Sequence, residues 1–328
     1  MSDAAQIADR LLVYLQGELH APTLTYADPP TPLRGGYETS IYAFKLRDGP
    51  PAFGGRLVLR LYAGTQRAES ALRESQVQSI LAQHGVAVAR AHLTCTNPSI
   101  LGGAFFIMDF VPGEHLVTVP LGTMPRILGE THAELHRRIS SSVLASLTCA
   151  GIPEDDFRLG QLNGTGTADV NEFTWAYDII AWLKAHHPTA RSDLTLCHGD
   201  FHPLNILAQA GAVTGILDWT DARIAEPAWD VARTILRLTL AFKHLVSPAW
   251  GRQWTTVDWD EIGQAYRYAY EAANPSGTAN LGYHEVEQRV LALAEGARGH
   301  PVWRYPPITQ QIIEAIQSIT GIRITIPW

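Results

Sequence analysis

The chain has few cysteines and no long apolar segment. Its three cysteines, Cys95, Cys149 and Cys197, lie far apart in 328 residues, and no two form a Cys-x-x-Cys pair. A disulfide framework or a cysteine zinc site is therefore not expected, and a reducing compartment is favoured. No apolar run approaches the ~18 residues that cross a bilayer. Charged residues interrupt the first ten positions, unlike in a signal peptide. We expect a cytoplasmic protein with no membrane partner.

Clusters of basic residues, repeats of fixed period and low-complexity segments are also missing. The formal net charge is −7 at pH 7, which together with the lack of a Lys/Arg cluster argues against a nucleic-acid partner. Hydrophobic residues make up 46% of the chain and charged residues 17%, as in a folded globular protein. The length is sufficient for two lobes, each with a core of its own.

Three polar side chains stand out in an apolar stretch, namely Asp200, Asn205 and Asp218. Residues 206–207 and 216–217 are typical of two short strands joined by a turn. In such a hairpin, Asn205 just before it and Asp218 just after it would lie roughly 5 Å apart. Two carboxylates at that separation repel by roughly 3 kcal/mol at an effective dielectric near 20, so the group favours a cation. Two carboxylates and an amide oxygen suit Mg²⁺ that shares its ligands with phosphates.

The spacing of these residues matches the template for phosphoryl transfer. That template places Asp and Asn in His-Arg-Asp-x-x-x-x-Asn, followed by a later Asp on the metal. Here His198-Gly199-Asp200 precedes Asn205 by the same spacing, with Gly in place of Arg. An isolated Asp more often caps a turn, but the ordered set disfavours that explanation. His-Gly-Asp-x-His-x-x-Asn followed by Asp218-Trp219 resembles the aminoglycoside phosphotransferase-like family of small-molecule kinases.

The resemblance implies an α+β, bilobal protein-kinase-like fold. Residues 1–113 would form a sheet-rich N-lobe and residues 114–328 a mainly helical C-lobe, with ATP between them. The expected reaction moves the γ-phosphoryl group of ATP to a hydroxyl of a small molecule. Candidate acceptors are an aminoglycoside or other antibiotic, an amino sugar or an amino alcohol, and the mild acidity of the chain suits a cationic one.

The resemblance also implies roles for residues of the central motif. Asp200 would accept or orient the proton of the acceptor hydroxyl, and Asn205 and Asp218 would hold Mg²⁺ against the nucleotide phosphates. His198 and Asp230 would support the loop that carries Asp200, with helix capping as the alternative for Asp230.

Other positions are expected to bind the nucleotide. Gly35 and Gly36 lie between two strand-like runs, where glycine lets backbone N–H groups approach an anion. In the resembled family such a loop covers the ATP phosphates, and Ser40 would be its short polar residue. The period of two in a strand places the Asp109 carbonyl and the Val111 N–H on one edge, as pairing with adenine requires.

A basic residue is expected to reach the phosphates from a strand over residues 56–62. Arg60 stands where kinases usually have the Lys that reaches the phosphates. Its planar guanidinium keeps its charge and binds phosphate in a bidentate manner. Residues 68–81 follow with helical spacing. In kinases a Glu on the corresponding helix pairs with the basic strand residue, so a Glu of this helix would pair with Arg60. We favour Glu74, with Glu69 as the alternative because the rotation of the helix is open.

Two further features have competing interpretations. His132 and His136 have the i, i+4 spacing of a helical metal site, but no third ligand accompanies them in a recognised pattern, so we disfavour a metal. Asp221, three residues after Asp218, would meet a cationic acceptor or lie in an exposed loop.

Two alternatives to a small-molecule kinase remain open. One is a nucleotide-binding pseudokinase or scaffold module, against which the intact Asp200, Asn205 and Asp218 argue. The other is a kinase that acts on Ser or Thr in a peptide. Acceptor identity, the choice between ATP and GTP, and the oligomeric state do not follow from the sequence.

Overall fold

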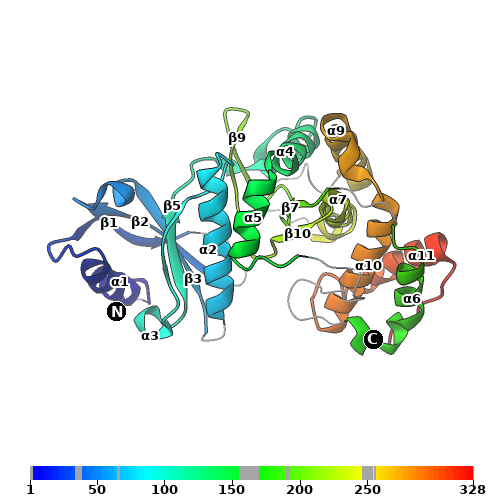
Figure 1. Ribbon diagram of the computed structural model, residues 1–328, viewed down its shortest axis with the longest axis horizontal. Coiled ribbons are helices and arrows are strands. Elements are labelled where there is room, and N and C mark those ends of the chain that lie inside the picture. The colour runs from blue at the N-terminus through cyan, green and yellow to red at the C-terminus, as the bar shows by residue number, and fades with distance from the viewer. Residues whose placement is uncertain are drawn as a thin grey trace. The chain divides into compact units, whose positions relative to one another are not determined.

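The computed structural model (Figure 1) describes residues 3–33, 39–64, 67–154, 170–188, 193–245, 254 and 256–327. The chain divides into two compact units. Unit 1 comprises residues 1–113, 149–152 and 207–220, and unit 2 comprises residues 114–148, 153–206 and 221–328. The predicted division placed everything after residue 113 in the second part, whereas the structure assigns two later segments to unit 1.

Unit 1 is built on a five-stranded antiparallel sheet in the order β1-β2-β3-β5-β4. Its strands are β1 (Thr25–Pro32), β2 (Thr39–Arg47), β3 (Arg56–Tyr62), β4 (Ala91–Cys95) and β5 (Phe105–Asp109). Its helices are α1 (Asp3–Glu18), α2 (Ala68–Gln83), α3 (Pro98–Leu101) and the short η1 (Pro51–Phe53).

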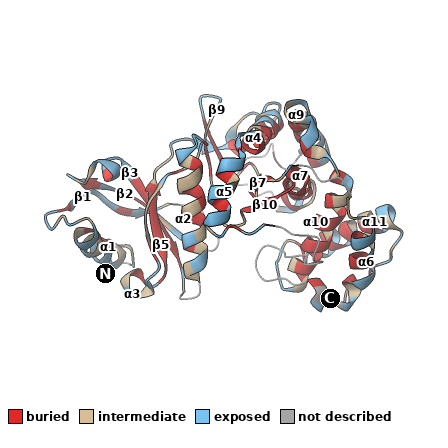
Figure 2. Cartoon of the chain, in the orientation of Figure 1, coloured by how far each residue is buried: buried red, intermediate tan, exposed pale blue. Residues whose placement is uncertain are grey.

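The central strand β3 is buried on both faces of this sheet, as Figure 2 shows. Because side chains alternate along a strand, Leu57, Leu59 and Leu61 join the core that α1 covers. Val58 and Tyr62 face the opposite side, where the α2 residues lie. Arg60 shares this second face, and that alternation directs its guanidinium toward α2 rather than α1.

A hairpin from the middle of the chain completes unit 1. It consists of β8 (Ile206–Gln209) and β9 (Ala212–Ile216), which are neighbours in a small sheet. The Ile216 N–H donates to the Ala87 carbonyl at 2.8 Å, and Thr214 Oγ1 donates to the Pro112 carbonyl at 2.6 Å. These bonds and the contact of Gly215 with Val111 explain why the hairpin groups with residues far before it in the sequence.

Unit 2 is mainly helical. Its longer helices are α4 (Met124–Arg138), α5 (Ser141–Cys149), α6 (Tyr177–Ala185), α7 (Pro227–Leu236), α9 (Trp259–Ala273), α10 (Leu281–Ala297) and α11 (Pro306–Thr320). The shorter elements are β6 (Glu114–His115), η3 (Leu116–Thr118), η5 (Val170–Glu172), η6 (Thr174–Ala176), η7 (Arg237–Phe242), α8 (Lys243–Leu245) and η10 (Pro275–Thr278). Strands β7 (Thr195–Cys197) and β10 (Arg223–Ala225) pair antiparallel. Among the described helices, none combines the length and the apolar character needed to cross a bilayer.

Helix α7 is buried along almost its whole length. It begins with Pro227, whose fixed φ suits the first helical position. Nine of its ten residues are buried, including the polar Asp230, Arg233 and Thr234. The helix continues directly into η7, which has the rare π-helical geometry that is frequent at functional sites.

Candidate active site

In unit 1, Arg60 of β3 connects two carboxylates. Its Nε lies 3.3 Å from Glu74 Oε2, and its Nη2 lies 2.9 Å from Asp218 Oδ1. Glu74 is fully buried on α2, whereas Glu69 on the same helix is exposed. Of the two glutamates considered, Glu74 is therefore the partner of Arg60.

The Glu74 carboxylate is surrounded by hydrogen-bond donors. It accepts from the Tyr62 hydroxyl, from Gln78 Nε2 at 3.2 Å, from Thr220 Oγ1 at 3.0 Å and from the Trp219 N–H at 3.4 Å. Burial raises the pKa of Glu74, and the Arg60 guanidinium opposes that shift. This network fixes the segment that carries Asp218 against α2.

Asp218 follows the hairpin in a left-handed backbone conformation, with φ of 62°. Its Oδ1 accepts from Arg60 and lies 2.8 Å from Thr220 Oγ1, whose single proton is donated either to Asp218 or to Glu74. The side chain is 37% exposed, and Oδ2 has no described hydrogen-bond partner. One carboxylate oxygen is therefore available for a hard cation such as Mg²⁺.

In unit 2, the Asp200 carboxylate lies between two cationic or potentially cationic groups. Its Oδ1 lies 2.5 Å from Arg237 Nη1 and 3.2 Å from His202 Nε2. Burial alone would raise the pKa of Asp200, but Arg237 and His202 together lower it below its ordinary value. Asn205 Nδ2 donates to the Asp200 carbonyl at 2.9 Å, which leaves the Asn205 amide oxygen free for a metal.

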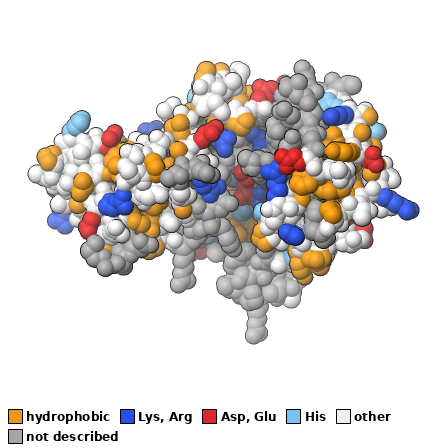
Figure 3. Space-filling view, turned by 90° about the horizontal axis from the view of Figure 1, so that it is seen from below, with side chains coloured by type: hydrophobic (Ala, Val, Ile, Leu, Met, Phe, Trp, Pro, Cys, Tyr) orange, Lys and Arg blue, Asp and Glu red, His pale blue; other side chains and the backbone are white. Residues whose placement is uncertain are grey.

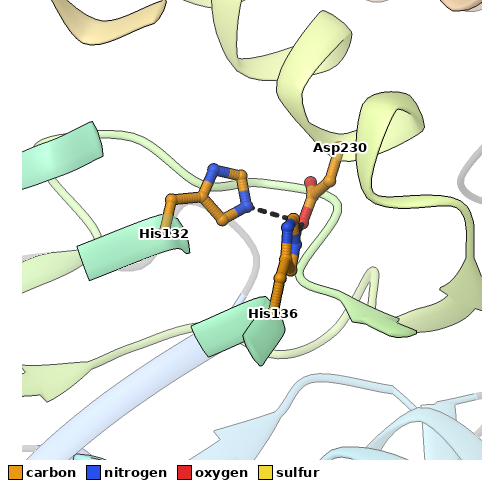
Figure 4. A group of neighbouring side chains, drawn as sticks. All are labelled: His132, His136 and Asp230. Carbon is orange, nitrogen blue, oxygen red and sulfur yellow. Dashed lines mark hydrogen bonds and ion pairs between the residues drawn. The ribbon is translucent and has the colours of Figure 1, made fainter. Parts of the chain in front are cut away.

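Asp230 of α7 holds the loop that carries Asp200. Its carboxylate accepts from the His198 N–H at 2.5 Å and from the Gly199 N–H at 3.0 Å. His132 Nε2 and His136 Nε2 lie at 3.0 and 3.4 Å from the same carboxylate (Figure 4). Burial alone would raise the pKa of Asp230, but these histidines help to hold it well below its ordinary value.

In the structure, Asp230 is a third potential metal ligand beside His132 and His136, and the sequence did not associate it with them. One ligand atom of each of the three residues lies within 4.8 Å of the other two. Their other ring nitrogens, Nδ1, lie 2.7 Å from the hydroxyls of Tyr266 and Tyr270. Burial lowers the pKa of His132 to about 4, so this ring is neutral. With both nitrogens of each ring engaged, the cluster is a hydrogen-bond network that supports the loop.

Of the residues that hold this loop, the sequence analysis named Asp230 but not Arg233, Thr234 or Arg237. Asp230, Arg233, Thr234 and Arg237 have the i, i+3, i+4, i+7 spacing of a single helix face. Arg233 Nε donates to a carbonyl of the loop over residues 198–201 at 2.6 Å, and Thr234 Oγ1 donates to another at 3.0 Å. Four polar residues on one face of an otherwise apolar segment were the available signal.

The residues predicted to cover the phosphates are only partly described. Gly35 and Gly36 lie outside the described residues. Ser40 is exposed and lines a pocket with Gln6 and Arg10 of α1. This pocket lies on the α1 face of the sheet, opposite the face that Arg60 shares, so the predicted contact of the Ser40 side chain with phosphate gains no support.

The predicted adenine-binding edge follows β5. The Asp109 N–H donates to the Arg90 carbonyl at 3.0 Å, and the Asp109 carboxylate lies 2.7 Å from His92 Nε2. Val111, two residues on, has the same backbone direction in an extended chain. The Asp109 side chain is thus engaged with His92, and only its backbone remains as a candidate contact for adenine.

Asp221 packs closely against the loop that carries Asp200. A Cβ on Gly199 would lie 2.5 Å from the Asp221 carbonyl oxygen, and Gly199 has a φ of 79°. Both facts explain why the motif has glycine at this position. Burial raises the pKa of Asp221 to about 6, so this carboxyl is partly protonated near neutral pH.

Sequence comparison matches residues 30–277 to the Phosphotransferase enzyme family (APH). Protein YcbJ of Bacillus subtilis is 34% identical over 192 residues, which cover 55% of this chain and 59% of YcbJ. Acyl-CoA dehydrogenase family member 11 of Homo sapiens is 27% identical over 229 residues, which cover 63% of this chain. The chain spans about a quarter of the length of the acyl-CoA dehydrogenase relatives that it matches.

Solved structures of phosphotransferases share the fold. A thermostable mutant of aminoglycoside phosphotransferase APH(4)-Ia, in complex with AMP-PNP and hygromycin B, superposes with a TM-score of 0.58 at 16% identity, covering 95% of this chain and 99% of that one. APH(2")-IIia, in complex with GDP and kanamycin, gives 0.56 at 17% identity over 94% and 98%. Macrolide 2'-phosphotransferase MphH from Brachybacterium faecium gives 0.52 at 18% over 97% and 100%.

The predicted α+β, kinase-like fold is confirmed by these superpositions. The family match extends over more than half of the residues and includes the whole motif from His198 to Asp218. The chain therefore belongs to the phosphotransferase enzyme family.

Proposed function

We propose that this enzyme transfers the γ-phosphoryl group of ATP to a hydroxyl of a small molecule. The observation that carries the proposal is the state of Asp200. Its carboxylate is ionised, 22% exposed, and held on a loop whose backbone is fixed by buried Asp230. A carboxylate that is fixed and open to solvent is suited to align an acceptor hydroxyl.

The reaction then needs one proton transfer and one exchange of bonds. Asp200 accepts the hydroxyl proton of the acceptor as the acceptor oxygen forms a bond to the γ-phosphorus. The bond from that phosphorus to the β,γ-bridging oxygen breaks, and ADP leaves with the electron pair. Because the protein takes part in no covalent intermediate, positioning and charge account for the catalysis.

For the nucleotide, the donor set fits Mg²⁺. Asp218 offers Oδ2 and Asn205 offers its amide oxygen, and both are oxygen ligands of the kind Mg²⁺ prefers. When bound, the ion would neutralise phosphate charge. Arg60, held by Glu74, would contact the phosphates, the loop of Gly35 and Gly36 would cover them, and the backbone of Asp109 and Val111 would meet adenine.

The acceptor classes that we propose are aminoglycosides or other antibiotics, amino sugars and amino alcohols. Two superposed enzymes were solved with kanamycin or hygromycin B, which supports a polyhydroxylated acceptor. Asp221 is the candidate contact for an amino group of the acceptor.

The test is an ADP-release assay with Mg²⁺ and ATP over kanamycin, hygromycin B, a macrolide, glucosamine, choline and a Ser/Thr peptide. Wild type should turn over at least one small molecule, and Asp200→Asn should be about 10²- to 10⁴-fold slower, as expected on loss of a proton acceptor. Thermal stabilisation by ATP should persist in the variant, which shows that it still folds and binds. Phosphorylation by Asp200→Asn at the wild-type rate would refute the role of Asp200, and turnover of the peptide alone would favour a protein kinase.

A further inference from the structure

Arg237 is the last residue of the polar face that α7 presents to the loop of residues 198–201. Asp230, Arg233 and Thr234 bind backbone atoms of this loop. Arg237 instead contacts a side chain, with Nη1 at 2.5 Å from Asp200 Oδ1. It is the first residue of η7, where the helix changes to π geometry.

The two oxygens of the Asp200 carboxylate have different surroundings. Oδ1 is inaccessible to solvent and faces Arg237 and His202. The side chain as a whole is nevertheless 22% exposed, and the described contacts of Arg237 and His202 are with Oδ1 and not with Oδ2. The described contact of Oδ2 is a long one, with Asn205 Nδ2 at 3.3 Å.

The other end of η7 strengthens this arrangement. The Phe242 ring lies 5.4 Å, centre to centre, from the His202 ring, which in turn contacts Oδ1. The first residue of η7, Arg237, therefore contacts Oδ1 of Asp200 directly. The last residue, Phe242, packs against His202, which contacts the same oxygen.

We propose that Arg237 is a positioning residue of the reaction, which holds Oδ1 of Asp200 so that Oδ2 faces the acceptor hydroxyl. The catalytic role of Arg237 in this proposal rests on the proposed function. The placement of the carboxylate itself has a readout that needs no turnover. Arg237 would touch neither substrate and would act only through Asp200.

Other charged or titratable groups also lie around Asp200. His198 and His202 belong to its own loop, and Arg233 and Arg237 face it from α7 and η7. Asp221 approaches from the segment before β10, and His300 from the segment after α10. Arg233 is paired with Glu295 at 3.1 Å. Arg237 is thus the arginine that contacts the Asp200 carboxylate directly.

The experiment compares wild type with Arg237→Met, Arg237→Lys and the control Arg267→Met, which removes an exposed arginine of α9. Crystal structures of these proteins are compared at Asp200. In Arg237→Met the carboxylate should leave its wild-type position, because the charged partner that contacts Oδ1 is lost. Arg237→Lys should retain most of the wild-type placement, and the control should not differ.

Kinetics on an acceptor from the panel provide the second readout. Arg237→Met should lower kcat by at least about tenfold with little change in the KM for ATP, because the proton acceptor is misplaced while the nucleotide site is intact. Its rate should also fall on acidification over a range in which wild type is flat. An Asp200 carboxylate that keeps its wild-type position in Arg237→Met, or an unchanged kcat despite a displaced carboxylate, would overturn the proposal. If wild type phosphorylates nothing, the proposed function fails, and the crystal structures alone decide the placement of Asp200.

Discussion

At the scale of single residues, His284 shows how this protein keeps a charge in its interior. Its Nδ1 lies 2.7 Å from Glu287 Oε2 and its Nε2 lies 3.2 Å from Glu226 Oε2, with only a tenth of the ring exposed. Burial alone would lower the pKa of His284, but the two carboxylates raise it to about 9. The ring is therefore a buried imidazolium at neutral pH.

The stability of the protein should consequently depend on this ring at alkaline pH. The folded pKa of about 9 exceeds the ordinary 6.5, so the stabilisation is complete below pH 6.5 and is lost as the pH rises through 9. The loss should amount to about 3 kcal/mol. Urea unfolding at pH 6, 7.5 and 9.5 measures it, and the matched variant His284→Gln should lack this pH dependence. A parallel decline in both proteins would assign the effect to other groups.

At the scale of elements, α4 and α9 approach each other closely at Gly129. A Cβ there would lie 2.5 Å from the Tyr266 carbonyl oxygen and 2.8 Å from Ala269 Cβ. This approach lets the hydroxyls of Tyr266 and Tyr270 reach His132 and His136 on α4. The support of the Asp200 loop thus extends through α4 to α9.

A methyl group at Gly129 should force these helices apart. We expect Gly129→Ala to lower the free energy of unfolding by about 2 kcal/mol, as overpacking of a core does. Gly282→Ala is the control, because a Cβ at the start of α10 meets nothing within 4 Å, and the change should be neutral or slightly stabilising. Equal stability of the two variants in urea would show that α4 and α9 separate without cost.

The outcome for α2 shows what helical spacing leaves undecided. The pattern of residues 68–81 was consistent with either Glu69 or Glu74 facing the sheet. The structure buries Ala71, Glu74, Gln78 and Leu81, since these occupy one face of the helix. The buried Glu74 carboxylate is stabilised by Arg60 and by the hydrogen-bond donors around it.

At the scale of the whole molecule, nucleotide binding should be visible as a gain in stability. A ligand that binds the folded state at 100 times its Kd stabilises it by about 2.7 kcal/mol. We expect AMP-PNP with Mg²⁺ to raise the melting temperature of wild type and EDTA to remove much of that gain. Asp218→Asn should lose the part that depends on Mg²⁺, whereas Asp178→Asn, at an exposed site on α6, should keep it. An Mg²⁺-dependent gain that survives in Asp218→Asn would argue against this ligand.

Much of the fold and part of the site were predictable from the sequence. The spacing from His198 to Asn205, with Asp218 after a hairpin, indicated both the family and the kinase-like fold. The pairing of Arg237 with Asp200 was not predictable, because it joins positions that no local pattern relates. Asp230 was likewise separated by almost a hundred residues from His132.

On the face shown in Figure 3, the described Lys and Arg side chains are intermixed with Asp and Glu and form no extensive patch of one sign. This agrees with the lack of a basic cluster in the sequence.

The hairpin of β8 and β9 has a consequence for the order in which this protein is made. Unit 1 includes residues 207–220, which leave the ribosome about a hundred residues after Gly113. Domains generally fold as units during synthesis, N-terminal first. Unit 1 cannot be completed until residues 207–220 have been synthesised. Its sheet is therefore made early, whereas Thr220 and Asp218, which bind Glu74 and Arg60, are made late. During translation, the N-terminal part should thus expose apolar surface that can aggregate before unit 1 is complete.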